Sequence, residues 1–312
     1  MIGSLIGAIS AWIIAPFLLS VINRTKALFG GRQGQPWLQP YYDLWRLIRK
    51  GAVYSHTTSW VFRAGPMIGL AAIFTATLMV PFGGASALLS FPGDFLLLIY
   101  LLGVARFFTM LAALDTGSAF EGMGSNREAW FSALAEPALM LGIATIAREM
   151  GGGKQELLSL SGIHLSVTTA AWGQSGFELA LVAIALVVIM LSENSRIPID
   201  DPTTHLELTM IHEVMVLDHS GPDFAYILYS AALKLWVFAS LLIGLLLPFR
   251  VGFFVVDLVL ELAAVLGVAF GIGVVESIMA RLRMPRVPQL LVGAIALAAF
   301  AFVLERHGVL LQ

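Results

Sequence analysis

The sequence predicts an all-α, polytopic membrane protein with about eight transmembrane helices. Of its 312 residues, 58% are hydrophobic and only 12% are charged, whereas soluble domains carry roughly 25% charged residues. Such a chain has too little polar surface to cover a water-soluble fold. Apolar stretches also recur at about the 20-residue length that crosses a bilayer. The chain is therefore expected to fold within a membrane.

Eight segments are apolar enough to span the hydrocarbon core. The first is interpreted as a span and not a signal peptide, because Lys and Arg follow it and no small-residue cleavage pattern is present. The fifth is the weakest and needs residues 170–175 to cross. The predicted spans are Ile2–Ile22, Gly65–Phe82, Phe95–Ala113, Trp130–Ala147, Phe177–Leu191, Phe224–Leu247, Gly252–Val275 and Pro288–Leu304. The connections hold no soluble domain, so residues 1–312 are expected to form a single transmembrane domain.

The distribution of Lys and Arg predicts the orientation. Twelve of the 18 lie on the side of the connection that follows the first span, four lie on the opposite side, and Arg106 and Lys234 lie within spans. The richer side is expected to face the cytoplasm. Both termini are therefore expected on the non-cytoplasmic side of the cell membrane.

Two connections on the basic side have distinct patterns. In Leu38–Ile48, apolar and aromatic residues alternate with charged ones, which fits an interfacial amphipathic helix or, equally, a positive loop with aromatic anchors. Ser192–Asp223 is acidic, and Asp201 before Pro202 predicts the start of a short helix that reaches about Met215. His205 and His212 would share a face of it. Their spacing is not that of a zinc hydrolase, so a polar interface is favoured over a metal site.

Six ionisable residues lie within or at the ends of predicted spans: Arg106, Glu136, Lys234, Asp257, Glu261 and Glu276. A charge at the middle of a spanning helix costs roughly 2.5–3.5 kcal/mol even on the mildest scale. Such groups should pair or line a hydrated path. We favour a proton or ion relay, and static ion pairs that fix helix packing are the alternative.

The sequence offers no redox centre or catalytic residue of its own. Cysteine is absent, which excludes disulfides, thiolate metal sites and cysteine-held iron–sulfur clusters from this chain. The net charge of −2 gives no sign of a nucleic-acid partner. No metal or cofactor is therefore expected within the chain.

The acidic connection carries a recognisable pattern. Residues 193–200 read Glu-Asn-Ser-Arg-Ile-Pro-Ile-Asp, and Glu207-Leu208 and Ser220-Gly221 follow. This resembles the signature of the respiratory complex I subunit 1 family, which runs Glu-x-x-Arg/Lys-x-Pro-x-Asp, then Glu-Leu, then an acidic segment before Ser-Gly. Arg32-Gln33-Gly34 and residues 38–43 agree with the family's first loop.

Further stretches resemble the hydrogenase branch of that family, the membrane subunits of formate hydrogenlyase and hydrogenase-4 type complexes. They are residues 105–108, 114–118, 124–128, 135–137 and 276–283. The branch pattern runs Asp-Leu/Val-Ala-Glu-Ala-Glu-x-Glu-Leu, whereas residues 200–208 read Asp-Asp-Pro-Thr-Thr-His-Leu-Glu-Leu. Two carboxylates of the pattern are thus replaced by Thr and other residues, and a Pro is added. This departure argues against carrying the family's proton-entry path over to this chain unchanged.

The resemblance implies a subunit that couples electron transfer in a cytoplasmic redox arm to proton or Na⁺ translocation. Implied partners are hydrogenase-like large and small subunits, an iron–sulfur subunit and antiporter-like membrane subunits. Iron–sulfur clusters and a [NiFe] site or its relict would reside in those partners. The coupling role falls on Glu136, Glu193, Arg196, Asp200, Glu207 and Glu213, and burial alone adds Lys234 and Glu261. Docking of the arm is expected at Arg32, Asp43, Asp115, Arg127 and Glu128.

Two other functions are weighed. A quinone-binding, proton-pumping subunit of the NADH dehydrogenase type belongs to the same superfamily, but the hydrogenase-branch motifs argue against it. A stand-alone ion transporter would often show paired inverted repeats, and no convincing internal repeat is visible.

Overall fold

A computed structural model describes residues 2–151, 159–200 and 211–310 of the chain, without the side chains of 149–151 and 305–310. The described residues form helices and no β-strand. Eight of these helices are long and apolar enough to cross a membrane. They are α1 (Ile2–Phe29), α3 (Trp60–Thr77), α4 (Asp94–Asp115), α5 (Ala119–Gly151), α7 (Thr169–Glu193), α8 (Gly221–Leu246), α9 (Phe254–Ile278) and α10 (Val287–Leu310). The predicted all-α membrane fold is confirmed.

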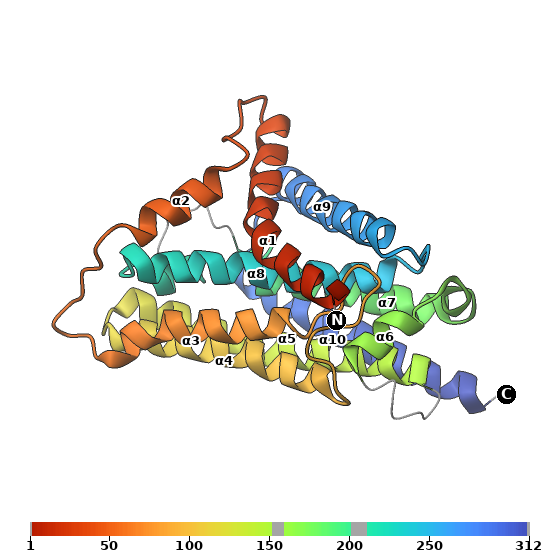
Figure 1. Ribbon diagram of the computed structural model, residues 1–312. Helices are drawn as coiled ribbons and strands as arrows, with labels where there is room; N and C mark the ends of the chain where they lie inside the picture. Colours follow the sequence, from red (N-terminus) through yellow and green to blue (C-terminus); the bar gives the residue numbers. More distant parts are fainter. Residues whose placement is uncertain (1, 152–158, 201–210, 311–312) are drawn as a thin grey trace.

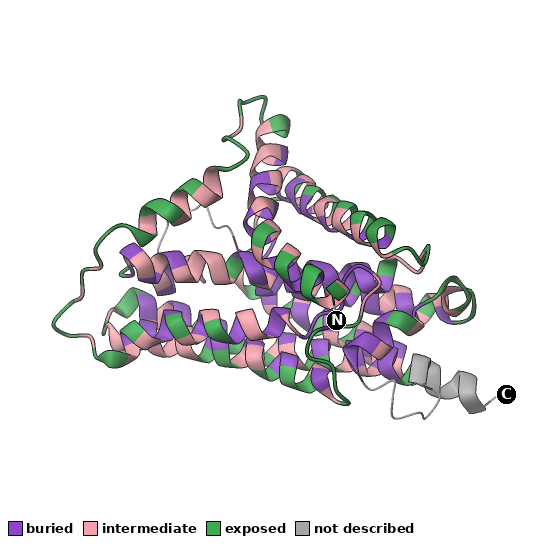
Figure 2. Cartoon of the chain, viewed as in Figure 1, coloured by how far each residue is buried: buried purple, intermediate pink, exposed green. Residues whose placement is uncertain are grey.

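Helix α8 lies at the centre of the packing. It contacts α1, α3, α7 and α9, while α10 packs against α5 and α7, and α3 packs against α4 (Figure 1). Its large side chains Trp236 and Phe238 are fully buried. Figure 2 shows buried residues along α8 and exposed ones along the outer face of α9. The apolar outer faces suit contact with lipid.

Several helix boundaries differ from the predicted ones by five residues or more. Helix α5 begins at Ala119, well before Trp130, because Glu121 and Glu128 of its polar first turns are buried by tertiary contacts. Helix α3 ends at Thr77. Helix α7 begins at Thr169 and has non-helical dihedral angles at Ser175. The expectation that the fifth span needs residues 170–175 is therefore confirmed.

The shorter elements lie in the connections. Helix α2 (Gln39–Ile48) decides between the two interpretations of residues 38–48 in favour of the helix, and it buries none of its residues. Helix α6 (Leu160–Ser166) precedes α7, and two 3₁₀ turns, η2 (Glu213–Val216) and η3 (Met284–Arg286), follow α7 and α9. The predicted helix from Asp201 falls mostly outside the described residues.

The connections divide into two groups. Those after α1, α4, α7 and α9 lie at one end of the bundle, which is called the Arg-rich end here. Those after α3 and α8 lie at the opposite end, called the terminal end. The described residues contain an even number of candidate spans, so α1 begins and α10 ends at the terminal end.

Candidate functional site

The guanidinium of Arg106 on α4 lies among three carboxylates inside the bundle. It donates to both oxygens of Glu193 on α7, at 2.7 and 2.8 Å, and to Glu136 on α5, at 2.6 Å. Its Nε lies 3.2 Å from Glu128, also on α5. Lys234 on α8 lies 2.8 Å from Glu193. Four helices therefore contribute charges to one cluster, which is largely buried except at Glu136, whose side chain is 41% exposed.

Local helix geometry brings these residues together. Glu128 and Glu136 are eight residues apart on α5, slightly more than two turns, so both reach the neighbouring helix α4. Glu193 is the last residue of α7, and the chain turns at Ser195, whose φ is 54°. This turn directs residues 196–200 back over the cluster at the Arg-rich end.

A second branch runs from Glu128 to the Arg-rich end. His212 Nε2 lies 2.9 Å from Glu128, and its Nδ1 lies 3.2 Å from Asp200. Asp200 also lies 2.9 Å from Arg281. Burial would lower the pKa of His212, but the two carboxylates outweigh it and raise that pKa to about 10. His212 is therefore a cation at neutral pH.

The pKa of Asp200 shows the same competition. Burial would raise it, but hydrogen bonds from His212 and the charges of His212 and Arg281 lower it below its ordinary value. The backbone N–H groups of Ile211 and His212 also donate to Asp200, at 3.3 and 3.1 Å. The ionised carboxylate thus organises the segment around His212.

A third group fixes the 196–200 segment to α9. Glu276 lies 3.3 Å from Arg196 and 2.9 Å from Lys26 of α1. The backbone N–H of Leu282 donates to the carbonyl of Pro198 at 2.8 Å. The acidic connection is therefore tied to α1 and α9 as well as to the central cluster.

A cavity of about 180 Å³ lies beside the cluster. Its polar wall includes Arg106, Glu128, Glu193, His212 and Lys234, and the rest is largely apolar. A polar cavity of this size has room for several water molecules. It is smaller than typical pockets for organic ligands, which measure about 300–1,000 Å³.

The structure brings most of the predicted coupling residues together. Glu136, Glu193, Asp200 and Lys234 belong to the cluster and its branch, and Arg196 is bound to the neighbouring Glu276. Three further placements complete the set. Glu213 lines the cavity, Glu207 lies outside the described residues, and Glu261 lies toward the terminal end, where Gly83 donates to it.

The predicted docking residues are more scattered. Arg32 is exposed, and Arg127 is half-buried. Asp43 pairs with Arg46 on α2, at 3.4 Å. Asp115 accepts hydrogen bonds from the backbone of Ser59 and Phe62 at the start of α3. Docking at these four stays a prediction.

Glu128 does not lie on the surface where a docking residue was expected. Its side chain is 6% exposed and is held by Arg106 and His212. Sequence reasoning noted Arg106 as a charge within a span but gave it no role, and interpreted His212 as part of a polar face. The informative signal was the intramembrane arginine, since such a charge needs buried partners.

Among the described residues, no group of three or more His, Asp or Glu side chains is placed to hold a metal ion. The site consists of ion pairs and a cavity, so what it can do chemically is hold, exchange and redistribute protons and charge.

Comparison with known proteins agrees with this architecture. A profile of the family described as NADH dehydrogenase matches residues 3–305. The chain belongs to the NADH dehydrogenase family, in its complex I subunit 1-like group. The chain is 28% identical to formate hydrogenlyase subunit 4 of Escherichia coli (strain K12), over 96% of each chain. It is also 28% identical to hydrogenase-4 component C of the same organism, over 99% of this chain and 96% of that one.

A solved structure shares the family fold. It is that of the membrane-bound sulfane sulfur reductase, an archaeal respiratory membrane complex, with a TM-score of 0.79 at 19% identity. The match covers 97% of this chain and 98% of that chain. At this identity the likeness shows the fold alone.

Proposed function

We propose that this NADH dehydrogenase family member is the membrane-embedded subunit of a hydrogenase-type complex related to formate hydrogenlyase. It couples electron transfer in attached subunits to the movement of protons or Na⁺ across the membrane. The names of the two relatives with 28% identity over nearly the whole chain support the type of complex. The ion-pair network supports the coupling role.

The observation that carries the coupling is the continuity of the network. From Arg281 at the Arg-rich end, contacts of 3.2 Å or less lead through Asp200, His212, Glu128 and Arg106. From Arg106 they reach Glu193 and Lys234, at the middle of α8. Two unit charges 4 Å apart interact by about 4 kcal/mol at an effective dielectric of 20. A change of charge at the Arg-rich end therefore alters the electrostatic energy of each successive group in the network.

His212 holds a special place in this mechanism. It is the cation between the carboxylates of Glu128 and Asp200. If it loses its proton, the two carboxylates face each other without a charge between them, and a proton or cation is drawn into the cavity. Electrons that arrive above the Arg-rich end supply the charge change that shifts this equilibrium.

The remaining assignments follow from the same proposal. The Arg-rich end faces the cytoplasm, both termini lie on the other side, and Arg32, Asp43 and Arg127 belong to the docking surface for the redox arm. Hydrogenase-like large and small subunits and an iron–sulfur subunit carry the clusters and any [NiFe] site. Antiporter-like subunits are the membrane neighbours. This chain supplies no cofactor and no catalytic residue.

The cavity volume weighs against the quinone-reducing alternative. About 180 Å³ suits water better than a quinone head group with its substituents. A stand-alone transporter fits poorly with relatives whose names identify them as components of complexes.

The test uses the intact complex in sealed vesicles. Hydrogen evolution from reduced methyl viologen and ion uptake are measured for wild type, Glu193→Gln and Lys234→Met, with Glu178→Gln on α7 as the matched control. Both network variants are expected to evolve hydrogen and to lose ion uptake, while the control keeps both. Normal uptake in both network variants would overturn the coupling proposal. Reduction of an added quinone, without hydrogen evolution, would favour the alternative.

A further inference from the structure

A second buried group of ionisable residues lies toward the terminal end, away from the Arg106 cluster. Glu261 of α9 accepts backbone N–H donors from Gly83 and Gly84, at 2.7 and 3.2 Å. Both glycines have positive φ, 68° and 67°. Successive N–H groups in such a turn form a concave anion site. Glu261 and Glu276 are 15 residues apart on α9, about 22 Å at the rise of an α-helix.

His164 on α6 is the titratable partner of Glu261. Its Nε2 lies 3.3 Å from the carboxylate. Its Nδ1 faces α8, since a Cβ at Gly244 would lie 2.6 Å from that nitrogen. Arg250 donates to the backbone carbonyls of His164 and Leu165 and fixes the end of α6. One ring nitrogen therefore faces an anion and the other faces α8.

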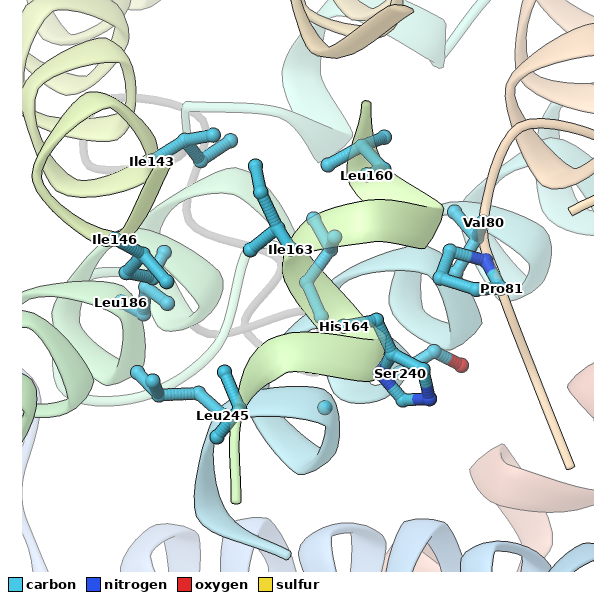
Figure 3. Close-up of a pocket in the computed structure, with 13 residues that line it drawn as sticks. Val80, Pro81, Ile143, Ile146, Leu160, Ile163, His164, Leu186, Ser240 and Leu245 are labelled. Atoms are coloured by element: carbon cyan, nitrogen blue, oxygen red, sulfur yellow. The ribbon is translucent and has the colours of Figure 1, made fainter. Parts of the chain in front are cut away.

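A small cavity lies at this side of the ring. It measures about 40 Å³ and is lined by apolar side chains together with His164 and Ser240 (Figure 3). Ser240 is 4% exposed, and its hydroxyl has no hydrogen-bond partner among the described residues. A buried hydroxyl without a partner is costly, and a cavity of this size admits a water molecule. The unpartnered hydroxyl and the cavity beside the ring together fit a water molecule that hydrogen-bonds to both Ser240 and the imidazole.

Ionisable side chains from two neighbouring elements lie around the His164 end of α6. The charged groups near His164 are Glu261 and Asp257 on α9 and Arg250 in the connection after α8. Asp257 accepts the N–H groups of Val251 and Gly252, at 2.8 and 3.1 Å. Helices α5 and α7 face the cavity with apolar side chains such as Ile143, Ile146 and Leu186.

We propose that His164, Glu261 and a water on Ser240 form a second proton-binding site, which serves the terminal-side end of the ion path. The inference rests on the proposed function. A proton carried by hydronium reaches the cavity water, which passes one proton to the free ring nitrogen as it receives another, and the Glu261 carboxylate holds the imidazolium. When the imidazolium returns this proton to water as hydronium, the ring is neutral again, so no other reactant is consumed. Ser240 lies six residues, about 9 Å along α8, from Lys234 of the Arg106 cluster.

The competing explanation is that the group around Glu261 has a purely structural role and attaches the 78–93 connection to α9. Gly244→Ala separates the two, because the new methyl group displaces the imidazole while Glu261 keeps its backbone donors. Gly267→Ala on α9 is the matched control, since a Cβ there meets nothing within 4 Å. His164→Gln removes the titratable group itself.

The intact complex in vesicles gives the deciding measurement. We expect His164→Gln and Gly244→Ala to evolve hydrogen normally while ion uptake falls about a hundredfold, as for the loss of a positioned proton-transfer group. Gly267→Ala should match wild type. Normal ion uptake in an assembled His164→Gln complex would overturn the proposal of a second proton-binding site. If Glu193→Gln also shows normal uptake, the proposed function fails as well, so the two failures are distinguishable.

A spectroscopic measurement covers the case in which His164→Gln does not assemble. Infrared difference spectra of the wild-type complex with isotope-labelled histidine are recorded as the pH is changed, and compared with Gly244→Ala. A proton-dependent histidine band that is altered in Gly244→Ala supports the site. An identical histidine response in both proteins overturns it.

Discussion

Arg106 donates to both carboxylate oxygens of Glu193, at 2.7 and 2.8 Å, and each of the two side chains is about 5% exposed. The same carboxylate lies 2.8 Å from Lys234. A buried carboxylate between two cations is stabilised only while both partners keep their charge. Removal of its charge leaves the cations without an anion that they share.

Glu193→Gln is therefore expected to destabilise the protein. Breaking a buried ion pair by removing one partner costs about 3–5 kcal/mol. The measurement is the apparent melting temperature of the detergent-purified protein. Glu178→Gln, a half-buried position on the same helix, should melt close to wild type. A melting temperature for Glu193→Gln equal to that of the control would contradict the ion-pair geometry.

The stability contributed by His212 should depend on pH in a defined direction. Its pKa is raised from 6.5 to about 10 in the folded protein, where Glu128 and Asp200 outweigh the effect of burial. The folded state thus binds more protons than the unfolded state between these values. This stabilisation is fully present below about pH 6.5 and is lost as the pH rises toward 10.

Melting curves across that pH range test the prediction. His212→Gln should show a weaker decline of melting temperature with rising pH than wild type, and the exposed His56→Gln should follow wild type. Parallel curves for wild type and His212→Gln would show that His212 does not carry the raised pKa.

Gly124 on α5 permits the close approach of the η2 segment. A Cβ there would lie 2.3 Å from Val214 Cγ1 and 2.9 Å from the carbonyl oxygen of Ile211. Gly124→Ala is expected to destabilise by about 1–3 kcal/mol through overpacking and to move His212 away from Glu128. Gly122→Ala is the control, because its Cβ makes only an ordinary contact at 3.9 Å. Ion uptake lost in Gly124→Ala alone would support the role of the Glu128–His212 contact, and equal effects would refute it.

The sequence predicted the eight spans because hydropathy and length are local properties. It misplaced the start of α5 because Glu121 and Glu128 are helical and buried only through contacts with distant residues. The same limit applies to the site. Arg106 and Glu128 are 22 residues apart in sequence, and spacing alone does not reveal that they meet. Glu261 shows the converse, since a buried acid was recognised but its glycine and histidine partners were not.

The orientation of the chain can be tested directly because it contains no cysteine, so a single introduced cysteine is the only thiol that can be labelled in this chain. Val53 lies in the connection after α1 and is 79% exposed, and Ser90 is exposed in the connection after α3. The excess of Lys and Arg at the Arg-rich end predicts that this end faces the cytoplasm. In intact cells, Ser90→Cys should react with a membrane-impermeant maleimide, and Val53→Cys should react only after the membrane is opened. The reverse pattern would place the termini in the cytoplasm, and the redox arm could then not dock from the cytoplasm at the Arg-rich end.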